Sequence, residues 1–478
     1  MKNRSNLFAN CEGVVPLRPR LESWMTELLS DTTMLHSICD THGAPLNVQH
    51  DGPFHRNINN LIDCVGEFGV PFLPMFARKA NKCLTYVESA RDLGIGVDAA
   101  STAEVAQCVD LGVRGSRIVC TAAVKDRDLM TLCINNGVTI IIDNSDELAL
   151  LEELAINPDL PVSVGLRLNG FVTDGKALYS RFGFPLAKID AIARRINRSS
   201  NLRLDGLHFH LHGYSFEDRI AAISQTLDLL KTLERPLDKS FFVDIGGGIP
   251  MNYLEQIDQW QEWLSQLDAA LAGSRPAITH RNSDLGRTKT AGQGAGSIDS
   301  YPVAQNLVQS EWVTKVLGGQ SGGSTIARRL KNENVTLRCE PGRSLLDGCG
   351  ITVARVTFCK EDSEGARVVG VQMNRTQSRS GFSEFAVDPL MVFGPSERRE
   401  PVEGYLAGTY CTESEWLTKR MMKFPHGVRP GDLMIFPNTA GYLMHFLESR
   451  SHQFPLAKNV FLDAERGGSV RQDPVDLI

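Results

Sequence analysis

Several short apolar runs in this 478-residue chain end in polar side chains that could do chemistry. The stretch FLPMFARKANK at 72–82 ends in a group of cations that includes Lys79. A lysine just after a buried strand is usually solvated. In a partly desolvated site, however, a lysine amine can react covalently with a carbonyl group. Lys79 is therefore the first candidate for a reactive residue.

A glycine-rich turn is a candidate for anion binding. In DIGGGIP at 244–250, three successive glycines follow a buried apolar run: Gly246, Gly247 and Gly248. Glycines let backbone N–H groups approach a phosphate closely, although a tight turn between a strand and a helix would use the same residues. The pattern by itself leaves both interpretations open.

The stretch CEPGRSL at 339–345 holds a carboxylate and a guanidinium three residues apart. Arg343 beside the glycine turn would bind a phosphate through two hydrogen bonds. Glu340 at the end of a strand would be a buried carboxylate that requires a cationic partner. Taken alone, the stretch is more typical of a surface Glu–Arg pair around a Pro-Gly turn.

Three histidines in LHFHLHG at 207–213 suggest a metal site. We predict none, because no acidic residue or further histidine is spaced to complete the ligand set. Strand alternation places His208 deep in the protein interior. His210 is predicted instead to pack its flat ring against a planar ligand.

Eight apolar runs rich in β-branched residues alternate with amphipathic helical segments from residue 70 onwards. We predict strands at 72–77, 95–100, 117–122, 138–143, 162–168, 204–210, 241–246 and 336–340. Eight β-then-α units favour an α/β fold with a closed (β/α)₈ TIM-type barrel over the alternative, an open doubly wound sheet. The active sites of such barrels lie at the C-terminal ends of the strands. The barrel would therefore bring the candidate residues together.

We predict three regions along the chain. An N-terminal segment (1–45) packs with a C-terminal domain, and the barrel occupies 46–335. Within the barrel region, the connection at about 249–335 is unusually long, and we expect a helix around 304–317. From 336 to 478 the helical alternation stops, and apolar runs bounded by Gly and Pro predict a mostly β domain, a β-barrel or a sandwich.

The composition narrows the function class. The chain is 42% hydrophobic and carries 50 Lys+Arg against 56 Asp+Glu, a net charge of −6, which argues against nucleic-acid binding. Its 11 cysteines form no CxxC pair, so a zinc site or a disulfide framework is not expected. No run is apolar enough for a membrane span or a signal peptide. We therefore expect a cytoplasmic protein that acts on a small molecule.

The candidate residues together describe one ligand. They would supply a phosphate site (the glycine turn and Arg343), a carboxylate for a ring nitrogen (Glu340), a stacking ring (His210) and a lysine (Lys79). Pyridoxal 5'-phosphate needs this combination, because its protonated ring absorbs the electrons of a substrate carbanion.

The chain resembles the pyridoxal-phosphate decarboxylases of the alanine-racemase-like barrel type, which include diaminopimelate and ornithine decarboxylases. FARKANK, GVDAASTAEV, SRFGF, GLHFHLHG, DIGGGIP and EPGRSL follow the order of the family's motifs. Further on, AGTYCTESE at 407–415 is similar to the loop with the family's catalytic cysteine. PNTAGY at 437–442 is similar to the stretch that ends in a phosphate-binding tyrosine. The resemblance covers roughly residues 36–460.

The resemblance implies a role for each matched residue. Lys79 would hold the cofactor, and Cys411 would deliver a proton to the α-carbon after carbon dioxide leaves. The other cofactor-binding residues would be His210, Gly246, Gly247, Gly248, Glu340, Arg343 and Tyr442. Arg181, Thr412 and Glu415 would bind the substrate. The resemblance also implies a homodimer with shared active sites, because the cysteine loop of the family comes from the second subunit, and a strand from HGAPLNV (42–48) in the C-terminal β domain.

One departure from the family bears on the substrate. The family usually has an acidic residue directly after the cysteine to bind a distal amine, and this chain has Thr412 there. We therefore hypothesise that the substrate is not free ornithine or lysine. An amino acid with an acylated or carboxylated far end, such as a citrate-conjugated amino acid of a siderophore pathway, fits better. The alternatives are an amino-acid racemase of the same fold and a non-enzymatic binding protein for the cofactor, and the retained cysteine loop argues against both.

Overall fold

The structure is a computed structural model that describes residues 7–477 except 236–240, 288–297, 300–302, 382–384, 398–399 and 464–468. The chain divides into two compact units. We call the unit formed by His55–Pro250 and Leu307–Leu345 the barrel unit. The β unit comprises Met1–Phe54, Met251–Asn306 and Leu346–Ile478.

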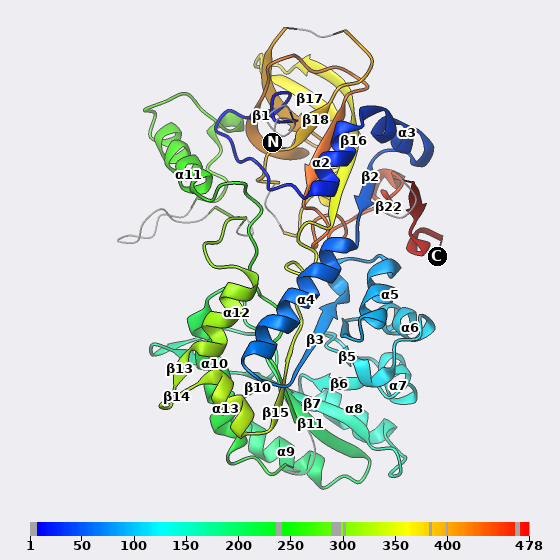
Figure 1. The fold of residues 1–478 in the computed structure, drawn as a ribbon, viewed down its shortest axis with the longest axis vertical. Coiled ribbons are helices and arrows are strands. Elements are labelled where there is room, and N and C mark those ends of the chain that lie inside the picture. The colour runs from blue at the N-terminus through cyan, green and yellow to red at the C-terminus, as the bar shows by residue number, and fades with distance from the viewer. Residues whose placement is uncertain are drawn as a thin grey trace. The chain divides into compact units, whose positions relative to one another are not determined.

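The barrel unit contains eight parallel strands that close on themselves (Figure 1). The first strand, β3, pairs with β4 on one side and with the last strand, β15, on the other, and β6 pairs with β7. This closure confirms the predicted (β/α)₈ barrel and excludes the open sheet. The strands are β3 (Phe72–Ala77), β4 (Gly96–Ala99), β5 (Ile118–Cys120), β6 (Thr139–Ile142), β7 (Val162–Asn169), β11 (Leu202–His208), β12 (Phe241–Asp244) and β15 (Val335–Cys339).

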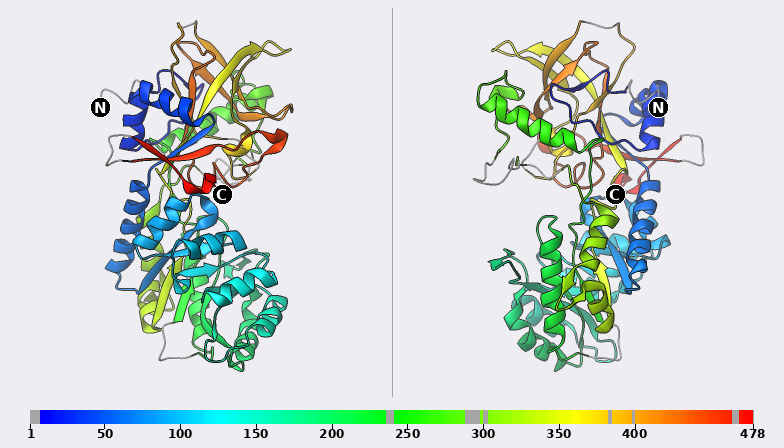
Figure 2. Two further views of the ribbon diagram at one scale, coloured as in Figure 1. Left: turned by 90° about the vertical axis from the view of Figure 1, so that its right-hand side faces the viewer. Right: turned by 60° about the vertical axis from the view of Figure 1, so that its left-hand side comes forward.

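Helices surround the barrel (Figures 1 and 2). Side-chain caps fix where several of them begin: Ser101 accepts a hydrogen bond from the Glu104 N–H, and Asn144 accepts from the Asp146 and Glu147 N–H groups. None of the described helices combines the length and apolar character needed to cross a bilayer. The helices are α4 (Gly52–Glu67), α5 (Leu84–Asp92), α6 (Thr102–Asp110), α7 (Arg127–Asn135), α8 (Ser145–Leu154), α9 (Ile189–Asn197), α10 (Phe216–Leu230), α12 (Gln309–Gly318) and α13 (Ile326–Asn332).

One aromatic side chain fills the centre of the barrel. Phe242 packs with Met75, Val119 and Ile141. A Cβ on Gly206 would lie 2.4 Å from the Phe242 ring, so this neighbouring position has no room for a side chain. Burial of a phenylalanine contributes roughly 1.5–3 kcal/mol. The barrel therefore has a packed core, in which the Arg338 guanidinium on β15 also lies 3.9 Å from the centre of the Phe242 ring.

The β unit is built on a ten-stranded sheet. Strand β2 pairs with β16 and β22, so the segment HGAPLNV does supply a strand to this sheet. The strands are β1 (Glu12–Gly13), β2 (Leu46–Gln49), β16 (Gly350–Glu361), β17 (Arg367–Val371), β18 (Leu390–Val392), β19 (Val402–Ala407), β20 (Trp416–Phe424), β21 (Leu433–Pro437), β22 (Lys458–Leu462) and β23 (Val470–Gln472). The helices are α2 (Ser23–Ser30), α3 (Thr32–His42) and α11 (Asp258–Leu271).

The unit boundaries differ from the predicted regions. The predicted break between 335 and 336 falls inside β15, which belongs to the barrel unit. The first part of the long connection, Met251–Asn306, belongs to the β unit. The reason is the apolar face of α11, because Trp263, Leu264 and Leu267 are buried in the core of the β unit. The second part returns to the barrel unit with α12, close to the helix predicted around 304–317.

Candidate active site

The first candidate, Lys79, lies at the mouth of the barrel. It sits in a short 3₁₀ turn, η1 (Arg78–Ala80), directly after β3, and its Nζ pairs with Oδ2 of Asp98 on β4. Thr121 donates a hydrogen bond to the other oxygen of Asp98. Burial raises the pKa of Asp98, whereas the Lys79 ammonium lowers it. The lysine side chain keeps 32% of its surface exposed, so its amine is both oriented and accessible.

The glycine turn at 246–248 has a backbone shape that only glycine fits well. Gly246 and Gly248 have φ values of +66° and +81°. A Cβ on Gly246 would lie 2.7 Å from Nδ1 of His210, and a Cβ on Gly247 would lie 2.8 Å from the Glu340 carbonyl oxygen. The turn therefore packs closely against its neighbours and has no room for a side chain.

A buried arginine supports this turn from below. Arg219 on α10 donates hydrogen bonds to the carbonyl oxygens of Gly247 (2.6 Å) and Leu211 (3.2 Å). Burial lowers the pKa of Arg219 to about 10, so the guanidinium is still charged at neutral pH. Sequence reasoning missed Arg219. The only sequence feature that could have identified Arg219 is its position as a cation in the first turn of a helix that otherwise begins with acidic residues.

His210 is fixed beside the glycine turn. The Gly247 N–H donates to His210 Nδ1 over 3.2 Å, so that nitrogen carries no proton. Loss of hydration and the nearby Arg219 and Lys79 cations lower the pKa of the imidazole well below its usual range. The ring is therefore neutral, and the His210 side chain is exposed.

Glu340 lies at the end of β15 with a histidine beneath it. His208 Nε2 is 3.1 Å from Glu340 Oε1, and both side chains are buried. Ligand atoms of His208, Asp244 and Glu340 all lie within 4.8 Å of one another. The expectation that no acidic residue lies close enough to complete a ligand set with the histidines is therefore wrong. The pairing of β11 with β12 brings Asp244 beside His208, which sequence spacing does not show. That the protein holds no metal stays a prediction.

Arg343, the predicted phosphate ligand, is buried three residues after Glu340. Two backbone hydrogen bonds hold this segment: the Glu340 N–H donates to the Gly246 carbonyl (2.9 Å), and the Ala77 N–H donates to the Pro341 carbonyl (3.3 Å). The segment that carries Arg343 is thus tied to the glycine turn and to the strand that precedes Lys79.

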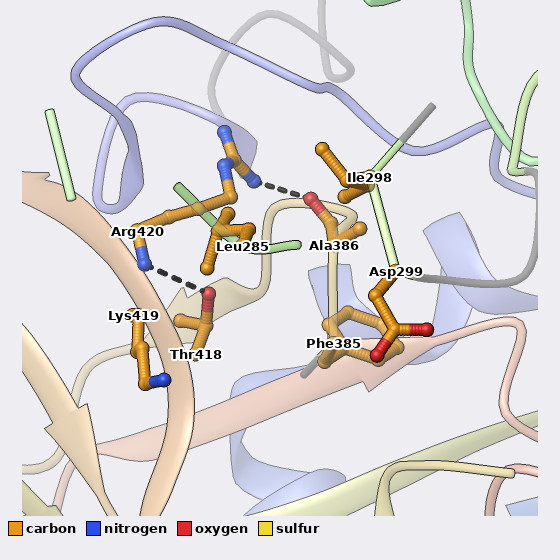
Figure 3. Close-up of a pocket in the computed structure, with 8 residues that line it drawn as sticks. All are labelled: Leu285, Ile298, Asp299, Phe385, Ala386, Thr418, Lys419 and Arg420. Carbon is orange, nitrogen blue, oxygen red and sulfur yellow. Dashed lines mark hydrogen bonds between the residues drawn. The ribbon is translucent and has the colours of Figure 1, made fainter. Parts of the chain in front are cut away.

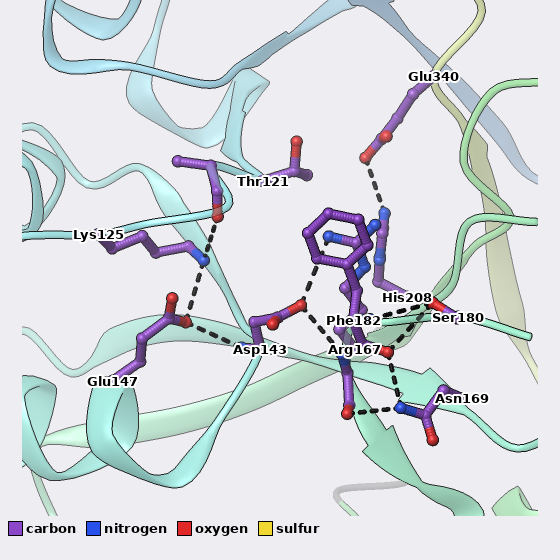
Figure 4. Close-up of polar contacts among 12 residues, drawn as sticks. Thr121, Lys125, Asp143, Glu147, Arg167, Asn169, Ser180, Phe182, His208 and Glu340 are labelled. Carbon is purple, nitrogen blue, oxygen red and sulfur yellow. Dashed lines mark hydrogen bonds and ion pairs between the residues drawn. The ribbon is translucent and has the colours of Figure 1, made fainter.

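A chain of buried charges lines another side of the barrel mouth (Figure 4). Lys125 Nζ lies 3.0 Å from Glu147 Oε2, which accepts the Asp143 N–H over 2.9 Å. Asp143 Oδ1 accepts the Gly183 N–H (3.0 Å) and lies 3.5 Å from Nη1 of Arg167. Sequence reasoning missed Lys125 and Glu147, since neither belongs to a motif that the resemblance used. They hold Asp143 and hence Arg167 in place.

The loop at 180–183 carries the predicted substrate residue Arg181. Its guanidinium lies 3.9 Å from the centre of the Phe182 ring, and that of Arg167 lies 4.1 Å from the same ring. The side-chain amide of Asn169 donates to the carbonyl oxygens of Phe182 and Gly183, each over 2.7 Å. Arg181 is exposed, so the loop presents a solvent-facing cation after β7.

The remaining predicted residues belong to the β unit. Cys411 and Thr412 are exposed, and Tyr442 is a half-buried residue with a positive φ of +70°. Glu415 is buried: it accepts the Arg375 N–H over 2.7 Å, and its other oxygen lies 3.4 Å from Arg375 Nε. Both oxygens of the Glu415 carboxylate are therefore directed towards Arg375 of the same chain.

The β unit also contains a small pocket with room for no more than a water molecule (Figure 3). Arg420 in its wall donates to the Ala386 carbonyl, and its backbone N–H donates to Thr418 Oγ1 over 3.1 Å. The pocket shares no residue with the predicted site, and its size excludes a substrate.

Comparisons with known proteins agree with this geometry. Residues 55–282 match the family described as "Pyridoxal-dependent decarboxylase, pyridoxal binding domain". The uncharacterised protein y4yA of Sinorhizobium fredii is 30% identical over 463 residues, which cover 94% of this chain and 95% of that protein. The diaminopimelate decarboxylase of Pseudomonas aeruginosa is 22% identical, with 93% and 94% covered.

Two further proteins are similar to this chain. The L-glutamyl-[BtrI acyl-carrier protein] decarboxylase of Niallia circulans is 23% identical over 385 residues, 77% of each chain. The crystal structure of diaminopimelate decarboxylase from Helicobacter pylori complexed with L-lysine superposes with a TM-score of 0.65 at 17% identity, covering 92% of this chain and 95% of that one. This likeness shows that the two chains share a fold.

Proposed function

The chain belongs to the pyridoxal-phosphate-dependent amino-acid decarboxylases, and we propose that it acts on an amino acid whose far end is acylated or carries a carboxylate. Family membership favours decarboxylation over the racemase and the non-enzymatic alternatives. The main support for the substrate proposal is the hydrogen bond and ion pair between Arg375 and Glu415. Because Glu415 is held in this way, it does not replace the acidic residue that is missing at position 412.

The barrel residues fit pyridoxal phosphate. The glycine turn has no room for a side chain, and Glu340 is a buried carboxylate at the end of β15, as the partner of a protonated ring nitrogen requires. Lys79 supplies an accessible amine at the same strand ends. The phosphate would be held by Gly246, Gly247, Gly248, Arg343 and Tyr442.

Each residue would have one task. When bound, the cofactor supplies the electron sink that lets the bond from the α-carbon to the carboxylate break. Lys79 holds the cofactor between turnovers, Glu340 keeps the ring nitrogen protonated, and His210 supports the face of the ring. Cys411 delivers the proton that replaces the carboxylate on the α-carbon.

We also propose a homodimer with shared active sites and a cytoplasmic location. Cys411 is the most exposed of the eleven cysteines, which suits a proton donor that reaches a site on a second subunit. All eleven cysteines lie in the described part of the chain and none forms a disulfide, which is typical of a reducing compartment.

The contacts of the cysteine loop support the substrate proposal. A distal ammonium in a partly desolvated site needs a carboxylate, because leaving it unpaired costs several kcal/mol. Thr412 cannot supply one, and Glu415 is buried against Arg375, whose Nη1 also donates to the Ser414 carbonyl over 2.9 Å. Only Glu413 in this loop is an exposed acid. The similarity to a decarboxylase of a glutamyl group on a carrier protein is consistent with a conjugated substrate.

The test compares kcat/KM for free ornithine, lysine and diaminopimelate with the values for their N-acylated forms and for citrate-conjugated amino acids. We expect the acylated or carboxylated forms to be preferred. If a free diamino acid is preferred by more than about tenfold, or about 1.4 kcal/mol, the proposal is wrong. Glu413→Gln is the matched variant: a loss confined to free diamino acids would show that Glu413 has replaced the missing acid.

A further inference from the structure

Three buried titratable side chains meet beneath the barrel mouth. His208 lies on β11 and Asp244 on β12, and the strand register pairs these two residues directly. Glu340 follows β15, the next strand in the sheet. All three are at most 4% exposed, and one ligand atom of each lies within 4.8 Å of the others. The reaction assigned above uses only Glu340.

Four polar atoms of this group lack an aligned hydrogen-bond partner within the described part of the chain: Asp244 Oδ2, both ring nitrogens of His208, and Glu340 Oε1. The other oxygen of Asp244, Oδ1, accepts the Gly246 N–H over 2.9 Å. Each buried polar atom left unpaired costs about 1–3 kcal/mol. Four such atoms on three neighbouring groups are most simply satisfied by one another.

The charges around the group decide where its protons lie. Burial raises the pKa of Asp244 well above its usual range and raises that of Glu340, while burial lowers the pKa of His208. Two adjacent buried carboxyls do not both ionise readily. Glu340 faces three cations and Asp244 only one of them, so the negative charge falls on Glu340. The charged groups that face the three residues are Lys79, Asp98, Lys125, Arg167 and Arg338.

We propose that Asp244, His208 and Glu340 form a directed relay in which Asp244 Oδ2–H donates to His208 Nδ1 and His208 Nε2–H donates to Glu340 Oε1. The relay uses all four unsatisfied atoms. It leaves Glu340 as the anion of the group, with its second oxygen available to the ring nitrogen of the cofactor. Asp244 and His208 are thus positioning residues that act through Glu340, and the relay rests on the proposed role of Glu340.

The relay has a consequence that does not depend on the substrate. The hydrogen bond that His208 donates stabilises the Glu340 carboxylate. The proton shared between Glu340 and the cofactor therefore lies on the ring nitrogen rather than on Glu340. Without the donor, that proton shifts from the ring towards Glu340. The test is NMR of the holoenzyme loaded with pyridoxal phosphate that is isotopically labelled at the ring nitrogen, together with the dissociation constant of the cofactor.

The variants are chosen to separate neutral from ionised Asp244. Asp244→Asn mimics the protonated acid, so we expect an unchanged ring-nitrogen signal. Asp244→Ala and His208→Leu should lower the ratio of protonated to unprotonated ring nitrogen by about tenfold, equivalent to about one pKa unit. His208→Gln can still donate to Glu340 and should lie between wild type and His208→Leu. Thermal unfolding of each variant checks that it folds.

The outcomes separate the relay from the proposed function. If the wild-type chain does not bind pyridoxal phosphate, the proposed function fails. If it binds the cofactor and Asp244→Asn shifts the signal as much as Asp244→Ala, then Asp244 is ionised and the relay is wrong. An unchanged signal in His208→Leu, or one divalent metal per chain by elemental analysis, would also overturn it. If the Ala and Leu variants do not fold, Asp244→Asn and His208→Gln decide together: a changed signal in Asp244→Asn, or an unchanged signal in His208→Gln, would overturn the relay.

Discussion

At the scale of single residues, the site depends on a few charged groups whose surroundings set their protonation. Lys79 is held by the buried Asp98, and Glu340 is a carboxylate that burial alone would neutralise. The cations Lys79 and Arg167 oppose that effect by lowering the pKa of Glu340. The roles of both residues can be tested one side chain at a time.

Lys79→Ala should abolish turnover and the absorbance of the lysine-bound cofactor while leaving the fold intact. The reason is that Lys79 directly follows β3 and is oriented at the barrel mouth by its pairing with Asp98. Lys82→Ala, three residues along the same loop, is the matched control and should keep both properties. The measurements are the absorbance spectrum and carbon dioxide release. Retained activity in Lys79→Ala would contradict the assignment of the site.

Glu340→Gln should keep the cofactor bound but slow turnover strongly, because a neutral amide no longer favours a protonated ring nitrogen. Steady-state kcat and the cofactor dissociation constant measure the two effects separately. A decrease in kcat of less than about threefold, roughly 0.6 kcal/mol of barrier, would mean that Glu340 does not contact the ring nitrogen.

At the scale of elements, the glycine turn after β12 depends on its supports. The Glu340 N–H binds the Gly246 carbonyl, the Gly247 N–H binds His210, and Arg219 on α10 binds the Gly247 carbonyl. Three elements therefore hold one turn, and a side chain at the turn would disturb all of them.

Gly246→Ala should weaken cofactor binding by tenfold or more, because the new Cβ would lie 2.7 Å from His210 Nδ1 and 2.8 Å from the Phe209 carbonyl oxygen. Gly94→Ala is the matched control. Gly94 has a φ of +68°, close to the +66° of Gly246, but no atom lies within 4 Å of its added Cβ. Both variants should lose about 1–2 kcal/mol of stability from backbone strain. Equal cofactor affinity in the two variants would show that the turn does not contact the cofactor.

At the scale of the whole molecule, the chain crosses between the two units several times. The barrel unit holds Lys79, His210 and Glu340, and the β unit holds Cys411 and Tyr442. The proposed shared-site homodimer makes each active site depend on residues from two chains.

Cys411→Ala should impair turnover much more than cofactor binding. Mixing it with Lys79→Ala should restore part of the activity, about a quarter of the wild-type value if subunits exchange at random and one site in each mixed dimer is intact. Subunit exchange is verified first with differently tagged chains. Absence of any recovery would indicate sites built within one chain.

The sequence by itself determined the barrel, because apolar runs and capped helices repeat eight times and each repeat is a local pattern. The ordered motifs also determined the cofactor, since Lys79 and the glycine turn follow strands whose ends must meet. Tertiary structure alone decided the rest. Strand register placed Asp244 beside His208, and packing put α11 into the β unit. Burial made Glu415 a support of its own loop and Arg219 a support of the glycine turn. These contacts join residues that are not neighbours in any local pattern, so spacing along the chain could not predict them.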